Sequence, residues 1–336
     1  MYDLLPSEDE AMIAVSLREF LEAELPIERL RPGTKPVDSG AVWQRMADLG
    51  WFGAGLPESA GGSGMGTIAE LLIQRECGRN LVSPNVLATT LAGHVAHHAG
   101  DGALAASLAS GTTTAALVIE ATPDAVGDRR DVLAIDRASS QMLLYWNDGG
   151  MGLFALPEMV EAPSIDDSVT LHTGGLQPSD ACHWIDAVSA PLPRHAALLL
   201  AAALAGLAEK ACYLAVDYAK LREQFGKPIG SFQAIKHRCA DMAVRQRLAW
   251  YQCCLAALKL EANAPDAAMQ VASAKLLAAE AAHENGRACI QIHGGIGFQA
   301  ECDAHWFVKR AAIYDQAGGS MQLQAERIIA APLPEW

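Results

Sequence analysis

The sequence predicts a mainly helical α+β protein, in which an N-terminal helical domain and a C-terminal four-helix bundle flank a small β domain. Apolar residues recur with helical period over residues 1–111, and long alanine- and leucine-rich helical runs return over 192–336. Between them, residues 112–191 hold short strand-like runs separated by Asp, Gly, Pro and Ser. Because strands and helices do not alternate, the usual parallel-sheet nucleotide folds are excluded.

The first domain is expected to begin with a well-capped helix. Ser7 and Glu10 form a capping-box pattern, followed by apolar residues at Ile13, Leu17 and Phe20. Further periodic runs follow, and the glycine-rich loop "GGSGMG" joins two of them. This loop follows no predicted strand and lacks GK[ST], so it is interpreted as a helix connection and not a phosphate loop.

The two later regions differ from each other in their residue patterns. The runs "TTTAALVIEA", "DVLAID", "QMLLYW", "GLFAL" and "SVTLHT" predict the short strands of the β domain. In the last region, Phe232, Ile235, Cys239 and Met242 have the spacing of a packed bundle helix. The apolar run Ala196 to Ala208 is shorter than the roughly 20 residues of a membrane-spanning helix, so we expect a buried helix and no membrane span.

Composition and charge limit which binding partners and which cellular compartment we expect. A formal net charge of -14 and a pI near 5.1 argue against nucleic acid and anionic membranes as general partners. The acidic opening "MYDLLPSEDE" does not resemble a signal peptide, which favours the cytoplasm. The eight cysteines show no metal-ligand spacing, so we interpret them as reduced packing thiols.

One helix carries a possible metal-binding pattern. His94, His97 and His98 stand at i, i+3 and i+4, a spacing that can hold a metal ion. No Glu accompanies them as in HExxH, and the segment ends at once in "AGDG". The pattern favours a solvated helix end, and we expect no metal site.

A polar corner interrupts the bundle at "REQFGKPIGSFQAIKH", Arg222 to His237. Its cations could grip a diphosphate while its amides and rings hold a sugar and base. A polar turn between helices would have the same composition. From this corner by itself, both interpretations therefore remain open. The side chains concerned are Arg222, Gln224, Phe225, Lys227, Phe232 and Gln233.

A second corner, "CIQIHGGIGFQAE", ends another bundle helix. Gln291 stands in the last turn, and Gly294 with Gly295 permits left-handed backbone and close approach by a ligand. Two such corners in one bundle suggest a single ligand.

With "LGWFGAGLPESAGGSGM" near the N-terminus, these two motifs resemble the acyl-CoA dehydrogenase family over nearly the whole chain. The resemblance implies FAD as cofactor and an acyl-CoA as substrate, with the flavin ring between β domain and bundle and the ADP half reaching a neighbouring subunit. It assigns the diphosphate and ADP contacts to Arg222, Gln224 and Phe225, with Gln233 beside them, and the adenosine end to Gln291, Gly294 and Gly295.

The chain departs from the family at the catalytic base. In "AAIYDQAGGSMQLQ" the position of the family's usual Glu is Gly318, and the alternative position on the first bundle helix is Ala196. We therefore predict no catalytic residue in this chain. Asp315 or Glu301 is a conceivable substitute, but a carboxylate displaced by a turn would miss hydrogen-bond reach of the α-proton. The flavin-side loops are reduced to "IEATPD", Ile119 to Asp124, and to Trp146.

This combination resembles the shorter subunit of the α2β2 acyl-CoA dehydrogenases of bacterial steroid side-chain catabolism. The leading hypothesis is that a longer partner supplies the Glu, that this chain completes its FAD site, and that an electron-transfer flavoprotein accepts the electrons. Two alternatives remain: a self-sufficient homomeric flavoenzyme with a relocated base, and a flavin-free scaffold protein.

Overall fold

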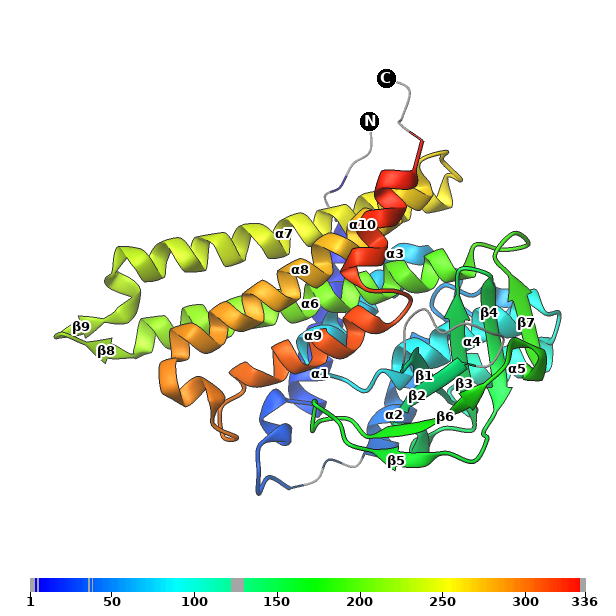
Figure 1. Ribbon diagram of the computed structural model, residues 1–336, viewed down its shortest axis with the longest axis horizontal. Helices are drawn as coiled ribbons and strands as arrows, with labels where there is room; N and C mark the ends of the chain where they lie inside the picture. Colours follow the sequence, from blue (N-terminus) through cyan, green and yellow to red (C-terminus); the bar gives the residue numbers. More distant parts are fainter. Residues whose placement is uncertain (1–3, 5, 36, 38, 122–129, 333–336) are drawn as a thin grey trace.

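The computed structural model describes residues 4, 6–35, 37, 39–121 and 130–332. The helical, β, helical order predicted from the sequence is confirmed, and Figure 1 shows the sheet packed beside three long bundle helices. The domain boundaries themselves stay a prediction. Of the segment "IEATPD", the residues from 122 onward lie outside the described residues.

Five helices of the N-terminal region precede the sheet. They are α1 (Glu8–Glu24), α2 (Ser39–Asp48), α3 (Gly66–Arg79), α4 (Asn85–His98) and α5 (Gly102–Ala109). The capping box that begins α1 is formed: the Glu10 amide donates to the Ser7 hydroxyl at 3.2 Å, and the Ser7 amide donates to the Glu10 carboxylate at 2.7 Å. The glycine-rich loop joins α2 to α3 as a helix connection, as expected.

Seven of the described strands form one sheet in the order β5-β6-β2-β1-β3-β4-β7. Its pairs are antiparallel, apart from the parallel pair of β1 and β3. Both faces of the central strands are buried, which explains their nearly continuous apolar sequence. The strands are β1 (Ala115–Glu120), β2 (Arg130–Ile135), β3 (Met142–Asn147), β4 (Gly150–Ala155), β5 (Val160–Ala162), β6 (Leu171–Leu176) and β7 (His183–Asp186).

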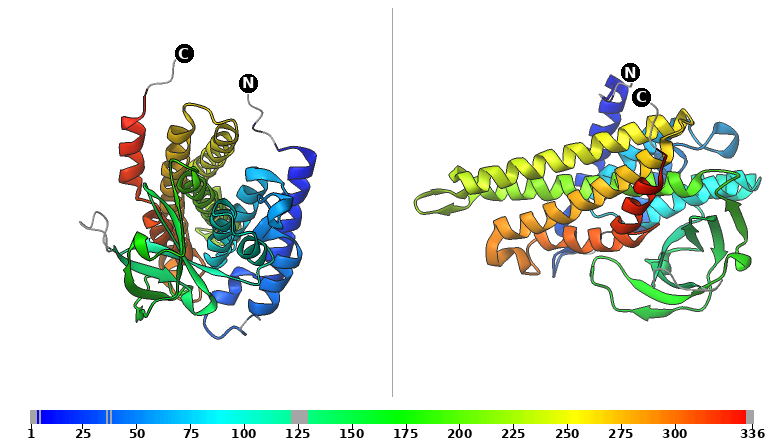
Figure 2. Two further views of the ribbon diagram at one scale, coloured as in Figure 1. Left: turned by 90° about the vertical axis from the view of Figure 1, so that its right-hand side faces the viewer. Right: turned by 45° about the horizontal axis from the view of Figure 1, so that its top comes forward.

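The C-terminal region is a bundle centred on one helix. It consists of α6 (Leu192–Leu221), α7 (Gln233–Glu261), α8 (Ala267–His293), α9 (Ala304–Gln316) and α10 (Met321–Ala330), with the small hairpin of β8 (Glu223–Gln224) and β9 (Lys227–Pro228) between α6 and α7. Figure 2 shows α10 turning back over the start of α8, toward the side on which the sheet lies.

Helix α6 connects the bundle to the first domain. A β-carbon at Gly78 would lie 2.0 Å from the Ala203 carbonyl oxygen, and one at Gly206 would lie 2.0 Å from the Arg75 carbonyl oxygen. These two glycines therefore let α3 and α6 pack backbone to backbone. The apolar run from Ala196 to Ala208 is buried throughout.

The expectation that α6 is too short to cross a membrane is wrong as a statement about length. The helix extends beyond both ends of the apolar run to a total length of 30 residues, and it is long and apolar enough to span one. However, 78% of its most apolar window is buried inside the protein, which is how the core helix of a soluble fold behaves.

The cysteines behave as packing residues. All eight are free thiols, and Cys77, Cys212, Cys253, Cys254 and Cys289 are buried, whereas Cys182 is exposed. Burial raises the pKa of the Cys212 thiol to about 11 and that of Cys254 to about 12, so these thiols stay protonated and unreactive.

Candidate functional site

The first predicted corner forms an exposed hairpin at the far end of the bundle. Phe225 and Gly226 occupy its turn with φ of 53° and 76°, which is the backbone of a tight two-residue hairpin turn. Arg222, Gln224 and Gln233 are exposed, and Phe225 is 93% exposed. Its ring meets Phe232 edge-on, at 6.1 Å between ring centroids. A 93% exposed Phe on a protruding turn is a residue that a partner surface would cover.

The second corner lies at the same end of the bundle. The His293 ring at the end of α8 stacks on Tyr218 near the end of α6, with centroids 4.2 Å apart. Figure 1 shows the hairpin and the end of α8 both at the left end of the bundle. Both predicted corners therefore belong to one surface, which we call the bundle tip.

Backbone geometry keeps the second corner open. Gly294 has φ 65° and ψ -144°, a conformation that L side chains rarely adopt, and a β-carbon at Gly294 or Gly295 would meet nothing within 4 Å. Gln291 lines a groove of about 530 Å³ between α7 and α8. Its other charged or polar walls are His237, Arg238, Asp241, Arg245, Glu284 and Arg287.

A much larger cleft of about 1230 Å³ lies between the sheet and the bundle. One wall comes from the ends of β1 and β3, and the other from the start of α6, the start of α8 and the α9–α10 junction. Gly318 and Trp146 both line it. The position that the resemblance assigned to the missing base therefore faces the cleft in which such a base would act.

Trp146 fills the space that a side chain at residue 318 would need. A β-carbon at Gly318 would lie 2.5 Å from Nε1 of Trp146, and Gly318 itself has φ 65°. The indole is only 5% exposed, and its Nε1 has no hydrogen-bond partner among the described residues. At residue 318, backbone conformation and packing thus both select glycine.

The segment that carries Gly318 is fastened by a buried lysine. Lys275 Nζ donates to the backbone carbonyl oxygens of Asp315, Ala317 and Gly319. Desolvation by burial lowers the pKa of Lys275 to about 7. Three carbonyls on one ammonium hold the segment in a single conformation, because breaking any of these bonds would leave a buried polar group unsatisfied.

The other residues considered as bases lie elsewhere. Ala196 is completely buried in α6. Asp315 is also buried, and its carboxylate accepts from the Met321 amide at 3.0 Å. Glu301 is exposed in the loop that follows α8, away from the residues that line the cleft.

Among the described residues, the three carboxylates that line the cleft are already engaged. Glu120 accepts from the Tyr145 hydroxyl at 2.5 Å, Glu326 accepts from Gln322 at 3.0 Å, and Asp148 pairs with Arg327. Sequence reasoning missed these three residues, because nothing in their local pattern shows that they border a cleft.

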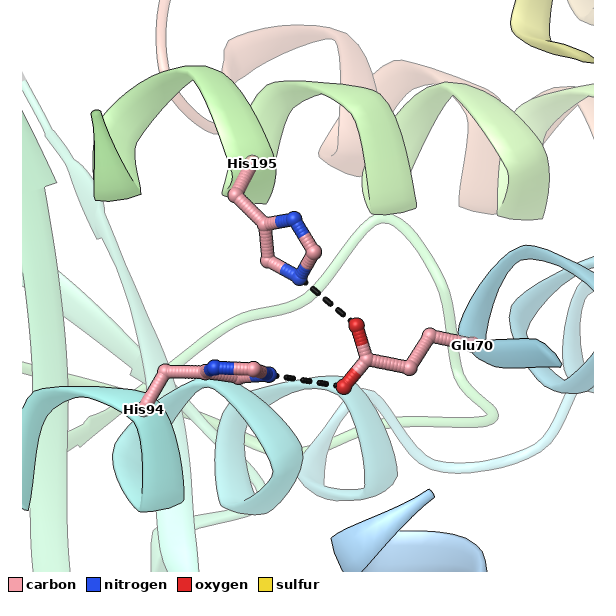
Figure 3. A group of neighbouring side chains, drawn as sticks. All are labelled: Glu70, His94 and His195. Carbon is pink, nitrogen blue, oxygen red and sulfur yellow. Dashed lines mark hydrogen bonds and ion pairs between the residues drawn. The ribbon is translucent and has the colours of Figure 1, made fainter. Parts of the chain in front are cut away.

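The sequence-based interpretation of His94 as part of a solvated helix end is wrong. Its side chain is 13% exposed, and Nε2 lies 2.7 Å from Oε1 of the buried Glu70. His195 lies 2.7 Å from the other carboxylate oxygen. Figure 3 shows the three side chains converging from α3, α4 and α6. His98 is exposed and His97 half-buried, so the solvated reading describes His98 alone.

Comparison with protein families identifies this architecture. Residues 7–113 match the acyl-CoA dehydrogenase N-terminal domain, and residues 193–333 match the acyl-CoA dehydrogenase C-terminal domain. The chain belongs to the acyl-CoA dehydrogenase family. The predicted oxidoreductase class is therefore confirmed at the level of the family, which is FAD-dependent.

Two curated relatives come from Mycobacterium tuberculosis. The chain is 34% identical to the acyl-CoA dehydrogenase IpdE2 over 81% of its own length and 80% of that protein. It is also 34% identical to the acyl-CoA dehydrogenase FadE34, over 80% of its own length. It spans only 39% of FadE34.

Solved structures share the fold at lower identity. The Mycobacterium tuberculosis ChsE4-ChsE5 complex contains a chain with a TM-score of 0.81 and 21% identity, covering 99% of this chain and 100% of that one. The Tcur3481-Tcur3483 steroid ACAD gives a TM-score of 0.79 and 22% identity, covering 96% of both chains. At such identities the likeness establishes the fold alone.

Proposed function

We propose that this chain is the non-catalytic subunit of a heteromeric, FAD-dependent acyl-CoA dehydrogenase, and that it completes its partner's FAD site in trans. The observation that carries this proposal is Gly318 packed against Trp146. The family's base position faces the cleft, carries no carboxylate and has no space for one. A cleft without a carboxylate at this position lacks the base with which the family removes the α-proton of an acyl-CoA.

The bundle tip supports the second part of the proposal. Arg222 would bind the FAD diphosphate through its forked guanidinium, with Gln224, Phe225 and Gln233 beside it. Gln291, Gly294 and Gly295 would hold the adenosine end, where the absence of side chains lets a ligand approach the backbone. All seven residues are exposed, so a cofactor held by another subunit can reach them.

The bound flavin would supply the hydride acceptor, and the residues of this chain would contribute binding and orientation. The partner would be a longer family member that carries the Glu, in an α2β2 assembly. The electron-transfer flavoprotein is the proposed acceptor, and the cytoplasm the proposed compartment. A steroid side-chain CoA thioester is the proposed substrate class, supported by fold likeness to a steroid ACAD and to a two-protein complex.

A second candidate is a self-sufficient enzyme whose base is Glu120, Asp148 or Glu326, because these carboxylates line the cleft. Each of them already accepts a hydrogen bond or an ion pair. A base in this position would have to leave that partner before it could accept a proton.

Flavin counting separates the two candidates. We would co-express the chain with a longer family member from its own genome, purify the complex, and titrate flavin against protein. One flavin per heterodimer, with no flavin and no acyl-CoA-dependent dye reduction by the chain alone, is the expected result. Two flavins per heterodimer, or activity of the chain alone, would establish a working cleft in this subunit. A chain that takes no flavin with any partner would be a scaffold protein.

A further inference from the structure

We infer that Glu70, His94 and His195 form a binding site for a divalent transition-metal ion of the Zn²⁺ type. The three side chains offer one carboxylate and two imidazole nitrogens, and these ligand atoms all lie within 4.8 Å of one another. They come from three helices, α3, α4 and α6, and Figure 3 shows them pointing at one another. This site is separate from the cleft and from the bundle tip.

The charge environment of Glu70 distinguishes it from the other buried carboxylates. Among the described residues, the remaining five each have an arginine or lysine beside them: Glu76, Asp166, Glu209, Asp303 and Asp315. Glu70, whose side chain has no exposed surface, instead has two imidazoles, which are charged only when protonated. A divalent cation would neutralise this carboxylate permanently.

The set of donors favours Zn²⁺ over Mg²⁺ and Ca²⁺. A carboxylate and a pair of imidazoles are donors that Zn²⁺ accepts, whereas Mg²⁺ and Ca²⁺ prefer oxygen ligands throughout.

The ligand atoms must rearrange to admit an ion, because they now lie up to 4.8 Å from one another. Each imidazole Nε2 now lies 2.7 Å from a carboxylate oxygen. Tetrahedral Zn²⁺, with bonds of about 2.0 to 2.2 Å, separates its ligand atoms by about 3.3 Å. The Nε2 atoms must therefore move away from the oxygens by about half an ångström, and each neutral ring must carry its proton on Nδ1, leaving the Nε2 lone pair for the metal.

The surroundings accommodate the carboxylate and leave the edges of the imidazoles open to solvent. A β-carbon at Gly55 would lie 2.3 Å from Oε1 and Cδ of Glu70, so glycine at residue 55 reserves the space that the carboxylate uses. The imidazoles of His94 and His195 are 13% and 12% exposed, which gives an ion and a fourth ligand, water, a path from solvent. A bound ion would tie the start of α6 to α3 and α4.

Cobalt provides a direct probe of the site. The full chain, in the assembly in which it purifies, would be dialysed against EDTA and titrated with Co²⁺. We expect the visible absorption of tetrahedral Co²⁺ to saturate at one ion per chain, with Zn²⁺ displacing it and Mg²⁺ having no effect. The inference would be overturned if the folded wild-type chain develops no such absorption and if Zn²⁺ leaves its melting temperature unchanged.

Variants test the ligands. Changing an outer partner of a metal ligand costs 10- to 100-fold in affinity, so removing a ligand in Glu70→Gln or His195→Gln should weaken Co²⁺ binding by at least about 100-fold. His98→Ala, an exposed histidine one turn after His94 at the end of the same helix, is the matched control and should bind as the wild type does. Unchanged affinity in folded Glu70→Gln would also overturn the inference.

If the variants do not fold, chemical protection replaces them. The wild-type chain would be treated with diethyl pyrocarbonate with and without Zn²⁺, and the histidines mapped by mass spectrometry. Protection of His94 and His195 by Zn²⁺, with His98 modified in both samples, supports the site. Equal modification of His94 and His195 in both samples would overturn it.

Discussion

The resemblance assigns the bundle tip and the cleft to parts of the family's flavin site, yet the two differ in almost every physical respect. At the tip, polar and aromatic side chains stand exposed and two glycines leave space. At the cleft, an indole occupies the space beside Gly318, and the three described carboxylates of the lining are engaged. In the proposed function, the tip would serve the active site of another subunit, whereas the base position in the cleft of this chain carries no carboxylate.

The largest expected effect concerns where the chemistry occurs. The complex should reduce dye with acyl-CoA, whereas the same complex with the partner's Glu changed to Gln should lose a factor of about 10² to 10⁴ in rate. The matched control is the triple change Glu120→Gln, Asp148→Asn and Glu326→Gln in this chain, which should leave the rate within about twofold of the wild-type complex. Steady-state kinetics measures both. A collapse of activity in the control would show that the cleft of this chain performs catalysis.

The next effect tests the tip. Arg222→Ala should weaken FAD retention in the complex by about 1.5 to 3 kcal/mol, because charge-assisted hydrogen bonds to a diphosphate are lost. Arg222→Lys should restore only part of this affinity, since an ammonium cannot form the bidentate pair. Fluorescence of released flavin gives the dissociation constant. The control is Lys220→Ala, which removes an exposed cation two residues away that pairs with Asp217. An equal loss of FAD affinity in this control would mean that only net charge matters.

Gly318→Glu tests whether the cleft can accept a base. We expect a free energy of unfolding lower by about 1 to 3 kcal/mol, because the new side chain collides with Trp146 and residue 318 has a positive φ. Gly318→Ala is the matched control: it has the same backbone strain and β-carbon without the carboxylate. Urea denaturation compares the two. A stable Gly318→Glu chain that rescues a complex lacking the partner's Glu would contradict the non-catalytic assignment.

The smallest effect concerns the lysine that fastens this segment. Lys275 has a folded-state pKa of about 7, below its ordinary value of 10.5, so the unfolded chain binds more protons between these values. The free energy of unfolding should therefore rise with pH from about 7 toward 10, by at most about 1.4 kcal/mol per pH unit from this group. Lys275→Met should remove that part of the pH dependence. Urea denaturation at pH 7 and at pH 8 measures this dependence. If the free energy of unfolding changes equally between the two pH values in the wild type and in Lys275→Met, Lys275 does not titrate in this range.

Local pattern was sufficient for much of this protein. The capping box at Ser7 and the bundle spacing around Phe232 depend on residues a few positions apart. The helical, β, helical order and the two corners between bundle helices could therefore be predicted. The cofactor roles of the tip residues remain predictions. The resemblance also directed attention to Gly318 as the vacated base position.

Tertiary structure alone decided which distant side chains meet. His195 and Glu70 are 125 positions apart, and the indole of Trp146 reaches Gly318 from another domain. No sequence period encodes such contacts, because they arise when separate helices and strands pack and buried polar groups must find partners. For that reason His94, at the end of a helix that ends in "AGDG", belongs to a buried cluster with Glu70 and not to the solvated surface.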